Sequence, residues 1–365
     1  MRHVWKSSAE YVYVSIIAGL CTFSSFTYGA AGTKLTDDIE QFFATNGTAV
    51  TKALYPRAET ARQILEAQSV VGVNKFLHMP ALTPTDNQPV VRMNRDAYYS
   101  KAVVNVSEGA TITLPDVPDG SYMSMQPVTE DHRPQAMSYG PGTYELATHT
   151  GSHLIVLIRL DSNFSPEQAR KYQQGMVVTA GSDEPFYTEQ YQRSSFYQVE
   201  NQLKVDLMGL VKKEGPLALS TSLFSSPTDE SRGLYRPEKN QVAAAIGWGG
   251  ALARDNIYET SPSFPATGCY ELTFEDPKNK HFWSITAYNR AGFMFSDTAN
   301  VNSYHAKANA DGTYTVRLGC GQQYPNNIPI QNDSGVFSIT ARHYGPSERV
   351  LKDGYRLVPR LKKVE

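Results

Sequence analysis

Three consecutive residues, Glu130, Asp131 and His132, carry the strongest potential for chemistry in this sequence. Two carboxylates beside an imidazole can hold a metal ion or share a proton, because histidine titrates near neutral pH. The three residues follow a strand predicted over residues 122–128, where the chain must leave its sheet. Adjacent side chains of an extended chain point to opposite faces, so they converge only if a turn forms. Catalysis by Asp131 and His132, with Glu130 binding a ligand, is one hypothesis, and a structural loop cap or ion pair is the other.

A second polar motif, Asn94-Arg95-Asp96, ends a strand predicted over residues 90–93. Asn and Asp at such a position form turns that cap the backbone, and arginine pairs with carboxylates or binds anionic groups. If both motifs open on one end of the same sheet, Arg95 would keep a neighbouring carboxylate ionised, close to Asp131 and His132, which would transfer the proton. Asp96 is then a further catalytic candidate, and Asn94 and Arg95 are ligand-binding candidates. The alternative is a polar clasp between loops.

A tryptophan among glycines, in Gly247-Trp248-Gly249-Gly250, lies where a helical region meets a second strand-rich region. Ligands often bind at such junctions and an indole ring stacks on sugars, so Trp248 is a ligand-binding candidate, with core packing as the competing interpretation. The sequence contains no G-x-S-x-G, H-E-x-x-H, G-x-G-x-x-G or P-loop motif, which excludes the enzyme classes that those motifs define. We predict no cofactor and no metal site.

Helical and strand periodicities succeed one another along the chain. Apolar spacing predicts helices over residues 36–44, 57–68 and 187–211, and Ser165-Pro166-Glu167-Gln168 is a capping box that starts another. Short alternating runs between Gly and Pro turns predict antiparallel strands, with a polar loop over residues 225–240. The strand predictions cover residues 90–93, 102–106, 111–114, 122–128, 143–147 and 153–160, then 270–274, 282–288, 314–318, 336–342 and 355–357.

The N-terminus has the features of a secretory signal peptide. Arg2 and Lys6 precede an apolar run over residues 11–26, and Gly29 and Ala31 take the small-residue positions of a cut after Ala31. The run is short for a bilayer span, and a retained membrane anchor is the alternative. We therefore expect a periplasmic or secreted protein with no membrane span after cleavage.

Cleavage would leave two cysteines, Cys269 and Cys320. Thiols in an oxidising compartment tend to pair, and no Cys/His cluster favours zinc instead. We predict a disulfide between them rather than two free thiols.

The motifs above and several others resemble, in order, two sequence families. Residues 92–96, 122–126, 130–132 and 139–144 resemble domain-of-unknown-function family 1254, and residues 247–250, 282–289, 309–313 and 342–346 resemble family 1214, its usual C-terminal companion. The resemblance implies two antiparallel jelly-roll sandwiches in tandem, a double jelly roll, assembled as a homotrimer. It implies no reaction, and the cysteine pair is not part of the family pattern.

These expectations give a mainly β protein with a helical N-terminal segment and a helical connector. The predicted parts are a signal peptide (1–31), the helical segment (32–88), a first β-sandwich (89–163), the helical connector and loop (164–240) and a second β-sandwich (241–365). The 365 residues are 41% hydrophobic, enough for two folded cores. The formal net charge of −2 does not provide the positive electrostatic potential that binds the phosphates of nucleic acids, so we expect no nucleic-acid partner.

Two classes of function are consistent with the sequence. The first is an exported hydrolase or lyase that acts by acid/base chemistry on a small molecule. The second is a noncatalytic trimeric protein that binds a ligand or builds the cell envelope. Jelly rolls serve both classes, so the fold alone does not separate them.

Overall fold

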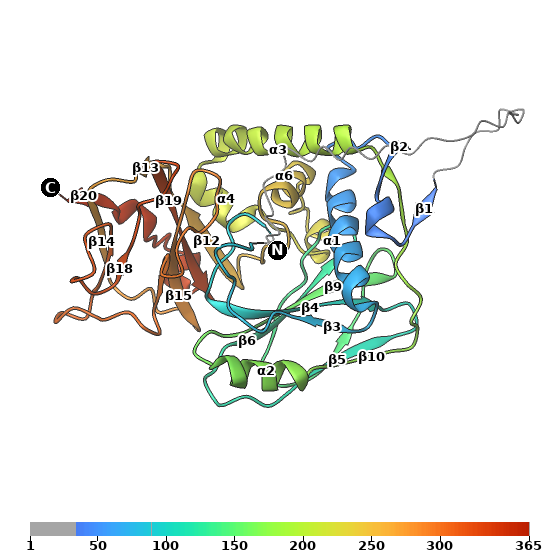
Figure 1. Ribbon diagram of the computed structural model, residues 1–365, viewed down its shortest axis with the longest axis horizontal. Helices are drawn as coiled ribbons and strands as arrows, with labels where there is room; N and C mark the ends of the chain where they lie inside the picture. Colours follow the sequence, from blue (N-terminus) through green and yellow to red (C-terminus); the bar gives the residue numbers. More distant parts are fainter. Residues whose placement is uncertain (1–33, 89, 365) are drawn as a thin grey trace, which may run out of the picture.

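The computed structural model describes residues 34–88 and 90–364, which form two groups of antiparallel sheets and a set of helices (Figure 1). The N-terminal sheets lie at the lower centre and right of the view, and the C-terminal sheets lie at the left. The predicted signal peptide lies outside the described residues. No helix in the described part of the chain is both long and apolar enough to cross a bilayer.

The N-terminal group consists of a five-stranded and a three-stranded sheet. Buried side chains of both sheets, such as Val104, Ile112 and Val156, form one hydrophobic core. Every strand pair is antiparallel. The order of strands in the five-stranded sheet is β3 (Phe76–His78), β4 (Ala97–Asn105), β9 (His153–Asp161), β6 (Met123–Thr129), β7 (Ser138–Tyr139). The order in the three-stranded sheet is β10 (Val177–Ala180), β5 (Ala110–Leu114), β8 (Gly142–Leu146).

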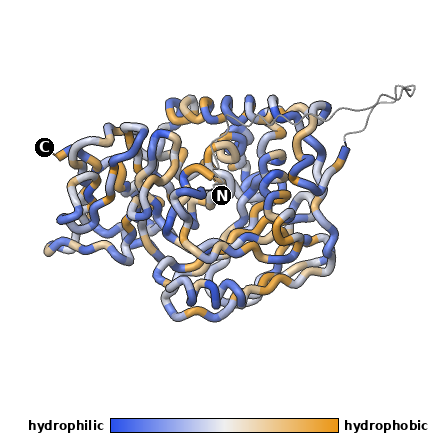
Figure 2. Tube along the Cα trace, in the orientation of Figure 1, coloured by the Kyte–Doolittle hydropathy of each residue, from blue (hydrophilic) through white to orange (hydrophobic). Residues whose placement is uncertain are grey.

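The second face of the five-stranded sheet is covered by helices. Val103, Val128 and Ile155 point away from the first core and pack with apolar residues of the helices. The middle strands are therefore buried on both sides, and Figure 2 shows hydrophobic residues concentrated along them. The helices that contribute to this second core are α1 (Tyr55–Val71), α3 (Arg193–Glu214) and α6 (Pro237–Gly247). The other helices up to this point of the chain are α2 (Pro166–Gln174), α4 (Pro216–Ser222) and α5 (Thr228–Ser231).

Two helix predictions are confirmed and one is wrong. Ser165 and Gln168 form the predicted capping box at the start of α2, and α1 contains the predicted 57–68 segment. The helix predicted over residues 36–44 is absent. That segment contains only a three-residue 3₁₀ turn, η1 (Ile39–Gln41), followed by β2 (Phe43–Thr48). Tertiary packing prevails over local propensity there, because Phe42 and Phe43 both contact the ring of Phe196 on α3.

Two further segments differ from the expectation. The polar loop predicted over residues 225–240 contains α5 and the start of α6. The helix predicted over 187–211 begins later, because β1 (Leu35–Thr36) pairs with β11 (Thr188–Glu189) before α3 starts.

The C-terminal group also combines two sheets around one core, which includes Leu272, Trp283 and Phe337. Its pairs are antiparallel except β17 with β18. No strand forms over residues 355–357; a short α7 (Glu348–Leu351) and η2 (Val358–Arg360) lie nearby. The order of strands in the first sheet is β12 (Asn256–Thr260), β19 (Val336–Tyr344), β15 (Phe282–Tyr288), β16 (Asn300–Asn302), and β13 (Phe264–Pro265) also pairs with β19. The order in the second sheet is β18 (Asn327–Ile328), β17 (Tyr314–Leu318), β14 (Cys269–Phe274), β20 (Lys362–Val364).

The architecture is thus a mixed α and β fold with several antiparallel sheets, richer in helix than the mainly β expectation. The jelly-roll connectivity and the domain boundaries remain predictions. The predicted disulfide is confirmed: Cys269 and Cys320 are bonded, with Cα atoms 4.5 Å apart and 51 residues of separation. Such a bond is typical of proteins in an oxidising compartment.

Candidate functional site

The chain turns sharply after β6, and this turn contains the first candidate motif. His132 adopts a left-handed conformation with φ of 62°, and the backbone N–H of Thr129 donates to the carbonyl of Arg133 at 3.1 Å. The Thr129 hydroxyl also accepts from the Arg133 N–H at 3.1 Å. The three candidate side chains therefore leave the turn in different directions, and each one meets a different part of the protein.

Glu130 is engaged by backbone donors. Its Oε1 accepts from the N–H groups of Ser152 at 2.9 Å and His153 at 3.1 Å. The carboxylate lies so close to Gly151 that a Cβ there would be 2.0 Å from it. Arg57 completes the surroundings with an ion pair at 3.5 Å. Glu130 therefore secures the loop before β9.

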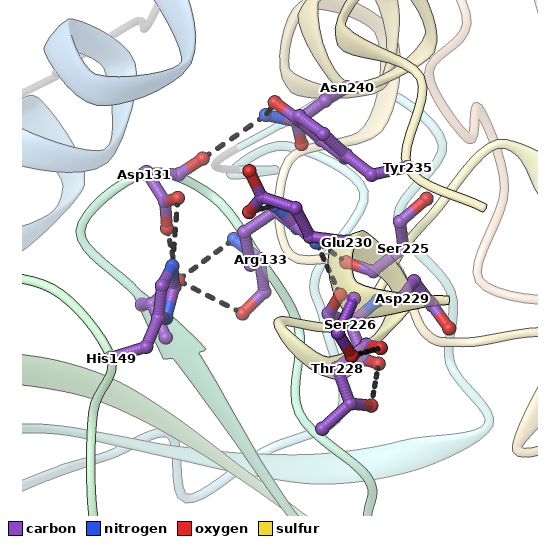
Figure 3. A network of polar contacts seen from close by, with 12 residues as sticks. Asp131, Arg133, His149, Ser225, Ser226, Thr228, Asp229, Glu230, Tyr235 and Asn240 are labelled. Carbon is purple, nitrogen blue, oxygen red and sulfur yellow. Dashed lines mark hydrogen bonds and ion pairs between the residues drawn. The ribbon is translucent and has the colours of Figure 1, made fainter. Parts of the chain in front are cut away.

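Asp131 lies at the surface, about one third exposed, and faces a second histidine (Figure 3). Its Oδ2 is 3.1 Å from Nε2 of His149, and its Oδ1 accepts from the Thr129 hydroxyl. The backbone carbonyl of Asp131 accepts from the Asn240 side chain at 3.2 Å. Asp131 thus pairs with His149, a partner that the sequence motif did not indicate.

His132 is fully buried and accepts a hydrogen bond at Nε2 from the N–H of Gly249, at 3.1 Å. The ring lies 6.0 Å from that of Trp248. Burial lowers the pKa of His132 to about 4, and the nearby carboxylates of Glu59 and Asp131 only partly oppose this effect. The imidazole is consequently neutral at pH 7 and takes a structural role between the turn and the Gly249 backbone.

Arg133, which sequence reasoning missed, anchors the same turn to the connector (Figure 3). The side chain is buried and donates to the backbone carbonyls of Ser225 and Ser226. The guanidinium lies 3.8 Å from the centre of the Tyr235 ring and 3.5 Å from a carboxylate oxygen of Glu230. The signal available in the sequence was an arginine directly after the Glu130-Asp131-His132 motif.

Trp248 packs with the helices rather than presenting a free ring. It contacts the core of α1, α3 and α6, and its indole N–H donates to the Thr60 hydroxyl on α1 at 3.0 Å. The glycines beside it allow close packing, since a Cβ on Gly250 would lie 2.0 Å from the Phe224 ring. The core-packing interpretation accounts for these contacts.

The second motif precedes β4, and the prediction that it ends a strand over residues 90–93 is wrong because no strand forms there. Each of its three residues has a separate role. Asn94 accepts from the Asp96 N–H at 3.0 Å and donates to the Tyr99 hydroxyl at 2.9 Å, which makes the predicted capping turn. Arg95 donates to the carbonyl of Thr83 at 2.7 Å and forms an ion pair of 3.1 Å with Asp297. Arg95 therefore points toward the C-terminal sheets.

Asp96 is fully buried between the two groups of sheets. Its carboxylate accepts from the Ser284 hydroxyl at 2.6 Å, the Tyr344 hydroxyl at 3.1 Å and the Asn300 amide at 3.1 Å. Burial raises the pKa of Asp96, and these three donors together with the nearby Arg342 guanidinium oppose the rise. The three donors come from β15, β19 and β16, so Asp96 links the first sheet to three strands of the second.

The two motifs do not meet, so the condition for the combined site, that both open on one end of the sheet, is not fulfilled. Strands β4 and β6 both pair with β9, and the residue after Asp96, Ala97, pairs with Asp161 while Thr129 pairs with Leu154. At about 3.3 Å per residue, the seven-residue offset on β9 is roughly 23 Å. Asp96 and Asp131 therefore lie at opposite ends of the sheet.

A cavity of about 440 Å³ opens beside Arg95 instead. It lies where the N-terminal sheets meet β16 and β18, and its lining is mainly polar. Asn300 and Asn302 are two residues apart in the edge strand β16, a spacing that puts both on one face and that was a usable signal in the sequence. The lining residues are Leu82, Arg95, Ser162, Asp297, Asn300, Val301, Asn302, His305, Tyr324, Asn326 and Asn327.

Groups of three or more His, Cys, Asp or Glu that could hold a metal ion do not occur within residues 34–88 and 90–364. His149 and His153, which are spaced like a metal pair, have other partners: His149 pairs with Asp131, and His153 contacts the carbonyl of Glu184 at 3.0 Å.

Comparison with known families confirms the resemblance seen in the sequence. Residues 73–157 match the family described as protein of unknown function DUF1254, and residues 260–348 match the protein of unknown function DUF1214. The chain therefore carries a region that matches DUF1254 followed by a region that matches DUF1214. No curated protein shows significant similarity to it.

The solved structures that are similar to this chain include two uncharacterised bacterial proteins. One is the VPA0106 protein from Vibrio parahaemolyticus, with 16% identity, a TM-score of 0.62, and coverage of 86% of this chain and 98% of that one. The other is a putative uncharacterized protein from Burkholderia cenocepacia, with 12% identity, a TM-score of 0.49, and coverage of 86% and 87%. The first similarity shows a shared fold.

The neutral state of His132 predicts a dependence of stability on pH. Its pKa is about 4 in the folded protein against 6.5 as the ordinary value, so the unfolded chain takes up the proton first as the pH falls. This stabilising contribution is complete above pH 6.5 and is lost between pH 6.5 and 4, with a loss of about 2 kcal/mol from pH 7 to pH 5. His132→Asn, which tolerates the left-handed backbone, should lose correspondingly less stability over that range.

Urea unfolding of both proteins at pH 7 and pH 5 measures this difference. His281, whose pKa burial also lowers to about 4, contributes in the same direction in both proteins and cancels in the comparison. Equal losses in wild type and variant would contradict a neutral buried His132.

The buried carboxylate predicts a large effect of Asp96→Ala. The substitution leaves Ser284, Tyr344 and Asn300 without their acceptor, and the free energy of unfolding should fall by about 3–5 kcal/mol. Asp297→Ala is a suitable control because that carboxylate is 70% exposed, and its loss should cost no more than about 1 kcal/mol. Chemical unfolding measures both, and equal effects would show that Asp96 does not link the sheets.

Proposed function

We propose that this protein is an exported, noncatalytic protein that binds a small polar molecule in the cavity beside Arg95. The observation that carries the proposal is the cavity of about 440 Å³ between the two groups of sheets, where Arg95 of the predicted site meets Asp297. Its size lies within the range of about 300–1,000 Å³ for small-molecule sites. Polar side chains from both halves of the sequence line it.

The state of the predicted acid/base residues favours binding over catalysis. His132 is neutral, buried and bonded to Gly249, while Asp96 is buried beneath three donors. A general acid or base must reach the proton that it transfers. Neither side chain is exposed, and roughly 23 Å of β-sheet separates their two motifs.

The exposed pair of Asp131 and His149 is the remaining catalytic candidate and keeps the enzyme hypothesis as the second proposal. An imidazole hydrogen-bonded to a carboxylate is suited to proton transfer. Within the described residues, however, neither the cavity beside Arg95 nor the one between α3 and α6 is lined by Asp131 or His149. The pair therefore supports an acid/base hydrolase or lyase less well than the cavity supports ligand binding.

Ligand binding at Arg95 predicts a matched pair of results. Small polar metabolites that raise the thermal midpoint of the wild-type protein should lose this effect with Arg95→Ala, because the guanidinium lines the cavity. Asp131→Asn should keep it, since Asp131 lies at the opposite end of the sheet. A thermal-shift screen measures both. Loss of the response with Asp131→Asn and retention with Arg95→Ala would reverse the assignment and favour the enzyme hypothesis.

Export and a homotrimeric assembly are part of the same proposal. The Cys269–Cys320 bond supports an oxidising compartment, and the trimer rests on the family resemblance. Light scattering of the protein at micromolar concentration should give three times the mass of one chain. A mass of one chain would contradict the trimer and leave the binding proposal unaffected.

A further inference from the structure

The cavity beside Arg95 has a lining whose chemistry indicates a class of ligand, if the proposed binding function holds. Its two charged side chains, Arg95 and Asp297, are paired with each other at 3.1 Å. Their charges offset one another, and His305 is the one further basic side chain of the lining. A ligand with a strong charge of either sign would have to displace this pair, and a neutral ligand would not.

Three of the four amide side chains in the lining are fixed at one end and available at the other, whereas Asn326 is hydrogen-bonded at both ends. Asn300 donates its amide to Asp96 at 3.1 Å, which leaves its carbonyl oxygen without a partner among the described residues. Asn302 and Asn327 use their carbonyl oxygens to accept from the N–H groups of Tyr304 and Cys320, at 3.1 Å and 3.0 Å. Both leave an NH₂ group without a hydrogen-bond partner in the described part of the chain. These amides are therefore oriented before any ligand binds, which reduces the entropic cost of binding.

An unpaired hydroxyl lies in the same lining. The Oγ atom of Ser162 is buried and has no hydrogen-bond partner within the described residues. A buried hydroxyl without a partner costs roughly 1–3 kcal/mol, so most buried hydroxyls are paired. A polar ligand group in the cavity would satisfy it.

Tyr324 adds an aromatic surface. Its side chain is 46% exposed, and the Arg317 guanidinium lies 5.1 Å from the centre of its ring. A tyrosine offers an apolar face and a polar hydroxyl, which suits a ligand that has C–H groups on one face and hydroxyls at its edge.

We propose that this cavity binds a neutral saccharide. Vicinal hydroxyls of a sugar are both donors and acceptors, and they match the free carbonyl of Asn300, the free NH₂ groups of Asn302 and Asn327, and the Ser162 hydroxyl. The C–H face of the sugar ring packs on Tyr324. The compensated charge of the Arg95–Asp297 pair selects against anionic and cationic molecules of similar size.

The full mature chain is tested by isothermal titration calorimetry against two sets of probes. The first set is glucose, galactose, mannose, N-acetylglucosamine, maltose and cellobiose, and the second is acetate, succinate and gluconate. We expect at least one neutral saccharide to bind and the carboxylates not to bind. Tyr324→Ala should weaken saccharide binding about tenfold, while Tyr324→Phe, which keeps the ring, should stay within about threefold of wild type.

Two further variants separate binding from folding. Tyr187, between β10 and β11, is 47% exposed and lies outside the cavity lining, so Tyr187→Ala should leave saccharide affinity unchanged. Ser162→Ala should weaken binding about three- to tenfold without lowering the thermal midpoint, because the hydroxyl has no partner to lose within the described protein.

Each other outcome overturns a defined part of the inference. Saccharide binding that Tyr324→Ala leaves unchanged would place the sugar elsewhere and refute this site. Carboxylate binding that requires Arg95, without saccharide binding, would refute the ligand class and retain the proposed function. Failure of both probe sets to bind would refute the saccharide, and the Arg95 thermal-shift screen would then decide whether the cavity binds any small molecule.

Discussion

The carboxylate of Asp96 is the interaction on which the arrangement of the two sheet groups depends. It belongs to the turn before β4, yet all three of its side-chain donors, Ser284, Tyr344 and Asn300, belong to the C-terminal group. An acceptor buried this completely costs free energy unless its donors are held in place, so the strands that carry them must keep a fixed position relative to β4. Arg95 is the neighbouring residue and is therefore directed to Asp297, and the cavity forms between the two groups as a consequence.

A second junction at the other end of the sheet explains why the acidic turn has a mainly structural character. Gly249 donates its N–H to His132, and the carbonyls of Gly249 and Gly250 both accept from Gln126 at 3.0 Å. Gln126 in turn accepts from the buried Arg159 at 2.8 Å. The glycine-rich segment thus satisfies polar groups on β6 and after it. Larger residues do not suit it, because Gly249 has a φ of 72° and a Cβ on Gly250 would lie 2.0 Å from the Phe224 ring. Residues that look catalytic in the sequence are used here to hold the connector on the sheet.

What the sequence could and could not predict follows from how local each signal is. The capping box of Ser165 and Gln168 depends on four adjacent residues, and most of the strands depend on short periodic runs, so these were accessible. The runs over residues 90–93 and 355–357 form no strand. The disulfide followed from a count of two remaining cysteines. The convergence of the two motifs depended on strand register, which no local pattern encodes, and the cavity brings Arg95 together with Tyr324, more than two hundred positions later. The helix expected over residues 36–44 was wrong because Phe42 and Phe43 bury their rings against α3.

Some side chains that line the cavity also form hydrogen bonds that hold the fold together, and these bonds determine which polar groups face the cavity. Asn300 serves both, since its NH₂ group completes the coordination of Asp96 while its carbonyl oxygen remains available at the cavity. One of the hydrogen bonds that join the two groups of sheets therefore also sets the orientation of an amide that we propose binds the ligand. In the same way, Asn327 orients its free NH₂ group by accepting from the N–H of Cys320, a residue held by the disulfide. Binding groups supported in this way lose little freedom when a ligand arrives, whereas a catalytic acid or base would need a proton-transfer path that the buried, fully engaged Asp96 does not offer.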